Sequence, residues 1–152
     1  MRVSRSTAYA LQAALQLADA PEDVPVPCSQ LAKAGEMPER FLLQILRNLV
    51  NHGLLHSTRG VEGGYRLSRP ADEITLLSVV EATDGPMTSE LPPLDGMPEY
   101  SKRRLEDVVQ DITREICRRL GQTSLADLLV AKDGQASRPF FEQAAELPLG
   151  MG

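Results

Sequence analysis

The spacing of two predicted helices restricts the fold of this chain more than any other feature. The first covers about residues 27–34 and ends at Gly35, and the second covers about residues 38–52 and ends at Gly53. Each opens with proline, which suits the first turn of a helix, and each is followed by glycine, which commonly ends one. Only two or three residues separate them. Two helices joined by so short a turn predict a helix-turn-helix.

A β-hairpin is predicted directly after this pair. Residues 54–57 and 65–67 have an extended pattern, and the loop between them contains the glycines of the stretch TRGVEGGYRLSR, residues 58–69. Two short strands around a glycine-bearing loop are typical of a hairpin. A helix-turn-helix followed by a hairpin has the order of a winged helix, in which the hairpin is the wing.

Apolar periodicity predicts the remaining helices. They are residues 4–19, the stretch LLSVVEAT, a long helix from about 99 to 120 that Gly121 stops, and the short stretch SLADLLVA. Hydroxyl side chains are available to cap three of them: Ser4 or Ser6, Thr75, and Thr123 or Ser124. A proline-rich segment precedes the long helix.

The long helix carries an apolar seam along one side. Its members step by four, three and four residues, which is the spacing of a coiled-coil surface: Leu105, Val109, Ile112 and Ile116. The spacing therefore predicts a coiled-coil-like seam on this helix.

Net charge is distributed unevenly along the chain. The total is −5, which by itself argues against a nucleic-acid-binding protein. Residues 1–70 contain 8 basic and 6 acidic residues, a net charge of +2, whereas residues 71–152 contain 8 and 15, a net charge of −7. An acidic C-terminal half can keep the protein soluble while the N-terminal half meets an anion.

The predicted helix over residues 38–52 has a polar face. Arg40, Gln44, Arg47 and Asn51 step by four, three and four along one side. Arginine and glutamine read guanine and adenine edges in a major groove. The position of this helix favours base contacts by Arg40 and Gln44 and a phosphate contact by Arg47, and the alternative is a solvated face. The opposite side is expected to be buried: Phe41, Leu42, Ile45, Leu46, Leu49 and Val50.

The wing offers a second candidate contact. Arg59 lies at its tip beside Gly60, and an arginine on a thin loop can enter a minor groove, where narrow A·T tracts concentrate negative potential. Gly63 and Gly64 permit positive φ and close approach of the backbone to a phosphate. Arg66 is expected to contact phosphate. The alternative is that the glycines only form a hairpin turn.

Residues 1–86 also carry a recognisable series of motifs. They include MRVSRSTAYAL, LAKAGEMPERFLLQILRNLVNHGLLHS and RG-x-x-GGYRL-x-RP followed by ITL. In these motifs the chain resembles the Rrf2 family of bacterial winged-helix transcription regulators. The resemblance implies a homodimer whose long C-terminal helices cross and whose winged helices each read half of a near-palindrome. By position it implies DNA contacts at four residues: Arg40, Phe41, Gln44 and Arg59.

The chain departs from that family in its linker. Many members hold three cysteines between the fourth helix and the dimer helix, and these cysteines bind an iron–sulfur cluster. Residues 86–104 contain no cysteine, and a cluster needs thiolate or histidine ligands. The chain therefore resembles the cluster-free branch of the family, and we predict no cofactor and no metal.

The two cysteines of the chain are candidate redox residues. Cys28 falls in the first turn of a helix, where the helix dipole favours thiolate, and the alternative is a small buried apolar residue. Cys117 lies beside Ile116 on the predicted dimer helix, either as core or near its symmetric mate. An intersubunit disulfide there would be a thiol-oxidation switch.

These features predict a mainly α protein in four parts. They are a winged helix-turn-helix DNA-binding domain with a small β-hairpin wing over residues 1–86, a linker over 87–98, long dimerisation helices over 99–132 and a flexible tail over 133–152.

The predicted function is that of a cytoplasmic, sequence-specific transcriptional regulator, a repressor that binds a palindromic site on double-stranded DNA as a homodimer. A small molecule or a protein is the expected effector. The alternative is a winged-helix protein-interaction module that does not bind DNA directly. Neither a membrane protein nor an enzyme is expected. The chain has no stretch of about 18 apolar residues, and it has no recognisable arrangement of nucleophile, base and acid.

Overall fold

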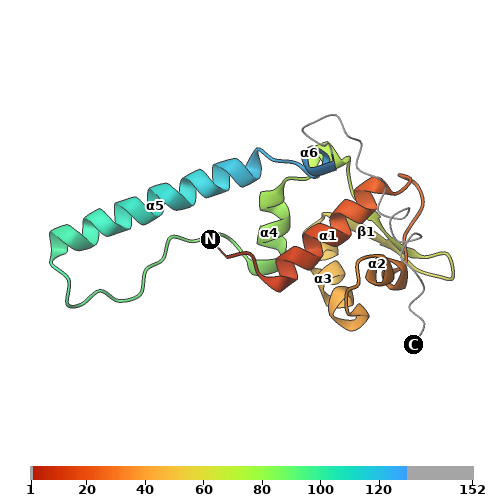
Figure 1. Ribbon diagram of the computed structural model, residues 1–152, viewed down its shortest axis with the longest axis horizontal. Helices are drawn as coiled ribbons and strands as arrows, with labels where there is room; N and C mark the ends of the chain where they lie inside the picture. Colours follow the sequence, from red (N-terminus) through yellow and green to blue (C-terminus); the bar gives the residue numbers. More distant parts are fainter. Residues whose placement is uncertain (1, 130–152) are drawn as a thin grey trace.

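The structure is a computed structural model that describes residues 2–129 (Figure 1). A mainly α winged helix is confirmed, and a long helix projects from it as an arm. The predicted flexible tail over residues 133–152 lies outside the described residues. The elements follow in this order: α1 (Arg5–Asp19), α2 (Cys28–Ala34), α3 (Glu39–Asn51), β1 (Leu55–Thr58), β2 (Gly64–Leu67), the 3-10 turn η1 (Ala71–Glu73), α4 (Leu76–Asp84), α5 (Glu99–Gly121) and α6 (Leu125–Leu129).

Hydroxyl groups cap α1 and join it to α4. The Ser4 Oγ accepts a hydrogen bond from the Thr7 backbone N–H at 3.0 Å, which confirms one of the two predicted caps. The Ser4 and Thr7 hydroxyls each donate to the Asp84 carboxylate at 2.7 Å. Thr7 Oγ1 also lies 2.7 Å from Thr83 Oγ1. Because Thr7 is fully buried, these bonds fix the start of α1 against the end of α4.

The helix-turn-helix consists of α2 and α3 with residues 35–38 between them. The Met37 backbone N–H donates to the Ala32 carbonyl oxygen at 2.8 Å, and the Met37 side chain is buried. A Cβ at Gly35 would lie 2.6 to 2.8 Å from the side chains of Met37, Gln16 and Gln12, so α1 approaches the turn closely. The prolines stand immediately before the helices rather than in their first turns: Pro27 and Pro38.

The wing is an antiparallel hairpin in which Leu55 of β1 pairs with Leu67 of β2. The return strand is also paired on its other side, where Val26 and Tyr65 exchange two backbone hydrogen bonds of 2.9 Å each. A Cβ at Gly64 would lie 2.4 Å from the Val26 carbonyl carbon. Position 64 therefore requires glycine so that the wing can lie against the segment between α1 and α2.

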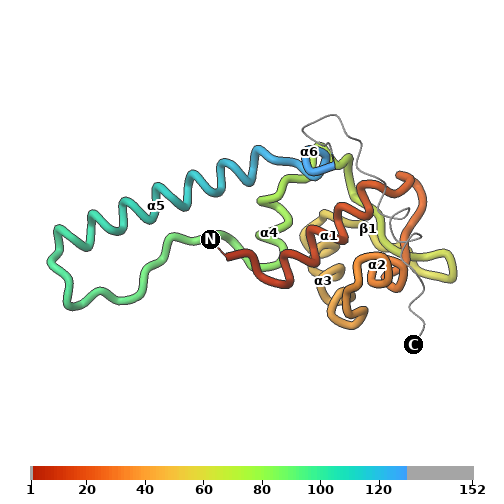
Figure 2. Tube along the Cα trace, in the orientation of Figure 1, coloured from red at the N-terminus to blue at the C-terminus, as the bar shows by residue number. Residues whose placement is uncertain are grey.

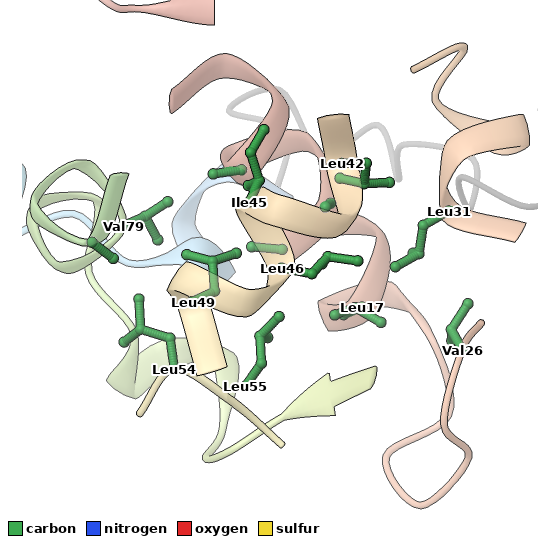
Figure 3. Packing of buried hydrophobic residues seen from close by; sticks show 14 of the residues in the cluster. Leu17, Val26, Leu31, Leu42, Ile45, Leu46, Leu49, Leu54, Leu55 and Val79 are labelled. Carbon is green, nitrogen blue, oxygen red and sulfur yellow. The ribbon is translucent and has the colours of Figure 1, made fainter. Parts of the chain in front are cut away.

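The hydrophobic core fills the space between α1, α3, α4 and the base of the wing (Figure 3). The buried face predicted for α3 is confirmed at four of its six positions. The prediction of burial is wrong for Phe41, which is 41 % exposed. Val50 is only partly buried. The largest fully buried apolar side chains are Leu31, Leu42, Leu46, Leu49, Leu55, Ile74, Val79 and Leu125.

The arm is formed by the linker and α5. The predicted cap of α4 is confirmed, since the Thr75 Oγ1 accepts from the Ser78 backbone N–H at 3.2 Å. After Gly85, which has a φ of 82°, residues 86–98 lead away from the domain, and α5 runs back toward it (Figure 2). Gly121 is the last residue of α5 rather than the residue after it. Neither α5 nor any other helix in residues 2–129 is long and apolar enough to cross a membrane.

The short helix α6 returns to the core. The Ser124 Oγ accepts from the Asp127 N–H at 3.2 Å, and the Asp127 carboxylate accepts from the Ser124 N–H at 2.8 Å, which is a reciprocal cap. The Leu125 N–H donates to the Ile74 carbonyl oxygen at 2.9 Å, and Leu125 is fully buried. The sequence-based prediction assigned α6 to the dimerisation helices over residues 99–132. In the structure, Leu125 of α6 packs in the core of the winged helix.

Candidate nucleic-acid interface

The outer face of α3 carries the residues that the sequence predicts to contact DNA. Arg40, Gln44 and Arg47 are all exposed, on the side opposite the buried leucines of the helix. The Gln44 amide donates to the Asn48 side-chain oxygen one turn later, at 3.3 Å. These side chains form a polar strip, which we call the α3 strip. A groove of DNA could contact this strip without disturbing the core. Their contact with DNA stays a prediction.

Phe41 lies at the edge of the α3 strip. Its ring meets that of Tyr9 edge to face, with ring centroids 5.8 Å apart and an angle of 75° between the planes. Tyr9 therefore holds the Phe41 side chain at the N-terminal end of α3, half in solvent. Sequence reasoning did not identify Tyr9. The available signal was an aromatic residue directly beside the buried alanines of α1.

The wing presents two exposed arginines. Arg59 follows β1, next to Gly60, which has a φ of 109°. Beyond it Val61 is fully exposed at the tip. Arg66 lies on β2 opposite His56, and both side chains are exposed. The structure thus leaves one arginine accessible at the tip of the wing and one along its return strand.

The paired glycines of the wing have an explanation inside the protein. A Cβ at Gly63 would lie 2.3 Å from the Thr58 carbonyl oxygen, and a Cβ at Gly64 would collide with the backbone of Val26. Of the two, Gly64 alone has a positive φ, 156°. The hairpin therefore needs both glycines whether or not a phosphate approaches them, and their contact with phosphate stays a prediction.

Cys28 lies at the contact between α2 and the start of α3. Its thiol donates to the Glu39 carbonyl oxygen at 3.8 Å. Burial, and secondly the nearby Glu39 carboxylate, raise the pKa of the Cys28 thiol. Thiolate is therefore disfavoured at Cys28, which is opposite to the effect expected from the helix dipole. Cys117 is a free, partly buried thiol on α5, and a redox role for either residue stays a prediction.

Tyr65 lies on the return strand of the wing, where its backbone pairs with Val26. It is partly buried against the core. Burial is the largest cause that raises the pKa of its hydroxyl, nearby Cys28 raises it further, and the Arg47 guanidinium lowers it. The partner strand of β2 in the hairpin, β1, packs directly against α3. The α3 strip and the wing are thus neighbouring parts of one surface.

The predicted dimer seam of α5 is only partly covered within residues 2–129. Ile112 is 55 % exposed, and the adjacent Val108 is 40 % exposed. No residue of α5 is buried. An apolar strip of this kind on a soluble domain commonly marks an interaction surface. The other seam residues are partly buried: Leu105, Val109 and Ile116.

The donor residues do not fit an iron–sulfur cluster. Among residues 2–129, no three His, Cys, Asp or Glu side chains are grouped so that they could hold a metal ion. Cys28 and Cys117 lie on different helices, and residues 86–104 contain neither cysteine nor histidine. The linker therefore lacks the ligand types that such a cluster requires.

Comparison with known sequences places the chain among transcriptional regulators. A family described as Rrf2, an iron-dependent transcriptional regulator, matches residues 3–131. A Mycobacterium tuberculosis protein named as an HTH-type transcriptional regulator is 38 % identical over 130 residues, which cover 84 % of this chain and 81 % of that protein. The HTH-type transcriptional regulator CymR of Bacillus subtilis is 30 % identical over 143 residues, covering 93 % and 99 % of the two chains.

Solved structures give the same result. CymR, described as the global cysteine regulator of B. subtilis, superposes with a TM-score of 0.68 and 26 % identity, covering 84 % of this chain and 95 % of that one. IscR of T. potens superposes with a TM-score of 0.69 and 25 % identity, covering 93 % and 96 %. The similarity thus extends over most of both neighbours.

Proposed function

The chain belongs to the Rrf2 family of DNA-binding transcriptional regulators, and on this basis we propose that it represses transcription as a homodimer bound to a near-palindromic operator. The observation that carries the proposal is the exposed α3 strip, which lies in one domain with the exposed Arg59 of the wing. The family relation and the geometry independently favour the same surface.

In the proposed complex α3 enters a major groove. Arg40 and Gln44 read base edges, since their side chains can form paired hydrogen bonds with guanine and adenine. Phe41 contacts the bases beside them, and Arg59 probes the adjacent minor groove. The remaining predicted contacts are with phosphates, from side chains and from the backbone of the wing: Arg47, Arg66, Gly63 and Gly64.

Two copies of the chain would pair through α5. The seam centred on Ile112 is apolar and accessible, and pairing it with its symmetric mate would remove it from water. A twofold dimer presents two recognition helices related by the same axis, so its operator is expected to be palindromic.

The matching family is described as iron-dependent, but the Cys, His, Asp and Glu side chains of residues 2–129 form no group that could hold a metal ion. We propose that the chain acts in the cytoplasm without a metal or a catalytic step. Its effector would be a small molecule or a protein that changes the spacing of the two recognition helices through the linker and α5.

The test is selection of random duplex DNA by the purified chain, followed by sequencing. An enriched palindrome is the expected result. Arg40→Ala should then weaken binding to that sequence by about tenfold or more, because it removes a contact to a base edge. Arg114→Ala is the matched control: it removes an exposed arginine on α5, outside the proposed interface, and should leave affinity within about twofold.

Two results would contradict the proposal. One is enrichment of no sequence at all, which would favour a winged helix that serves a protein partner. The other is an enriched site that Arg40→Ala and Gln44→Ala bind as tightly as the unaltered chain, which would mean that α3 does not read it.

A further inference from the structure

The carbonyl oxygen of Gly53, just beyond α3, accepts hydrogen bonds from two residues at the end of the wing. Ser68 Oγ donates to it at 2.6 Å and Arg69 Nη1 at 3.4 Å. Arg69 Nε also donates to the backbone oxygen of Glu73 in η1 at 3.3 Å. The Ser68 backbone N–H donates to the Leu54 carbonyl oxygen at 3.0 Å. These bonds join the end of α3, the return strand and η1 at one point.

Arginine suits this position for two reasons. Carbonyl groups at the C-terminal end of a helix carry partial negative charge, which favours a cation. The planar guanidinium also holds several donors at fixed angles, so one side chain can bond two carbonyls from different elements. A lysine would keep the charge but not the fixed geometry.

The return strand β2 is therefore held at both ends. Near its start the backbone of Tyr65 makes two hydrogen bonds with Val26, each 2.9 Å long. Beyond its end Ser68 and Arg69 bond to Gly53. Arg59 lies in the exposed loop between the strands. The direction in which that loop leaves the domain depends on how the two ends of β2 are fixed relative to α3.

We propose that Arg69, assisted by Ser68, is a positioning residue that fixes the wing relative to α3. It keeps the major-groove contacts of α3 and the minor-groove contact of Arg59 in register, without touching DNA itself. The inference rests on the proposed function. It also assigns a role to the arginine of the arginine–proline pair that closes the wing motif, a residue outside the predicted DNA contacts.

The test is a double-mutant cycle on operator affinity with the full chain. Arg69→Ala alone should weaken binding by about threefold to tenfold. In a chain that already carries Arg59→Ala, the same substitution should cost less affinity than it does alone, because the minor-groove contact that it positions has been removed. Arg69→Lys should behave like Arg69→Ala, since the charge alone does not hold the two carbonyls.

Amide hydrogen exchange of the free protein supplies a readout that does not involve DNA. Arg69→Ala should speed exchange at the Ser68 and Tyr65 amides by about tenfold, and it should leave amides in the middle of α1 unchanged. The first effect reports a loosened wing. The second shows that the domain as a whole remains folded.

Three results would overturn the inference: unchanged exchange in the wing, a full affinity penalty from Arg69→Ala in the Arg59→Ala chain, or restored affinity in Arg69→Lys. The last two would mean that Arg69 contacts phosphate itself. Failure of the proposed function is distinguishable, because it would appear as normal operator binding by Arg40→Ala, a residue that the Arg69 substitutions do not touch.

Discussion

Aliphatic side chains are buried in the winged helix, whereas several of those on α5 are exposed to solvent. In the winged helix, Leu31, Leu42 and Leu46 are completely buried. On α5, Ile112 is 55 % exposed and Val108 is 40 % exposed, and no residue of the helix is buried. The domain is therefore stabilised by burial within one chain, whereas α5 presents an apolar surface that one chain does not cover.

The polar side of α5 leads to the same conclusion. Its ion pairs join residues three or four positions apart, and their side chains are at least half exposed or nearly so: Arg103–Glu99, Arg114–Asp111, Arg118–Glu115 and Arg119–Glu115. Exposed pairs of this kind contribute little, and a helix with few tertiary contacts is marginal in water. The ion pairs alone are therefore not expected to stabilise a helix of 23 residues. Its stability is expected to depend on packing against a second helix, which the proposed dimer provides.

The largest effect should follow from removing part of the core. Leu46→Ala should lower the free energy of unfolding by about 3 kcal/mol, because it loses the transfer free energy of a buried leucine and leaves a cavity. Urea unfolding followed by far-UV circular dichroism, at one fixed protein concentration, measures the change. Leu128→Ala is the control, since Leu128 is 47 % exposed, and should cost less than about 1 kcal/mol. Equal losses would contradict the contrast between buried and exposed positions.

The next effect concerns the uncovered seam. Ile112→Glu should weaken self-association by more than about tenfold, because a carboxylate in the middle of an apolar seam would be buried without a partner. Sedimentation equilibrium should show a monomer whose winged helix remains folded.

The matched control for the seam is Gln110→Glu. It adds the same charge at an exposed position of α5 outside the seam, and it should remain dimeric. If Ile112→Glu sediments like the unaltered chain, the two copies do not pair through this surface.

The sequence predicts the helices well where local signals mark their ends. Ser4 and Thr75 cap α1 and α4 as expected, and Gly53, with a φ of 72°, follows α3. Caps and left-handed glycines act within a few residues, so a local pattern contains them. The exposed positions of Arg40 and Gln44 follow from the same helical periodicity.

Contacts between distant segments could not be predicted in this way. Phe41 is half exposed because Tyr9 of α1 meets one edge of its ring. Leu125 is buried because its segment pairs with Ile74, and position 64 needs glycine because Val26 lies against it. Each of these depends on how separate elements pack, and a periodic pattern within one element does not contain that information. The raised pKa of Cys28 has the same origin, since burial at the contact between two helices opposes the helix dipole.

A smaller effect is expected from removing a polar group inside the domain. This change should raise the free energy of unfolding rather than lower it. Gln16 is fully buried, and neither its side-chain nitrogen nor its oxygen has a hydrogen-bond partner among the described residues. Gln16→Leu should raise the free energy of unfolding by about 1 kcal/mol, because it removes a polar group that is desolvated without compensation. The thermal unfolding midpoint should rise accordingly.

The neighbouring Gln12 provides the control for this substitution. Its amide donates to the Gly35 carbonyl oxygen at 2.9 Å, so Gln12→Leu removes a hydrogen bond that exists and should lower the unfolding midpoint. A decrease in both variants would mean that the Gln16 amide is satisfied in solution.

The smallest effect should come from the exposed side of α5. Hydrogen bonds from Arg118 and Arg119 lower the pKa of Glu115 from 4.5 to about 2. A carboxyl whose pKa is lower in the folded state stabilises that state above its unfolded pKa. The contribution is lost as the pH falls from about 4.5 through about 2. Glu115→Gln should therefore slightly reduce the helix content by far-UV circular dichroism at neutral pH, and the two proteins should converge at the acidic end of this window. Added salt should also remove the difference, because both partners are exposed and the attraction is screened. A difference that survives high salt would show that Glu115 has a buried partner, and α5 would then resemble the domain more than its exposed seam indicates.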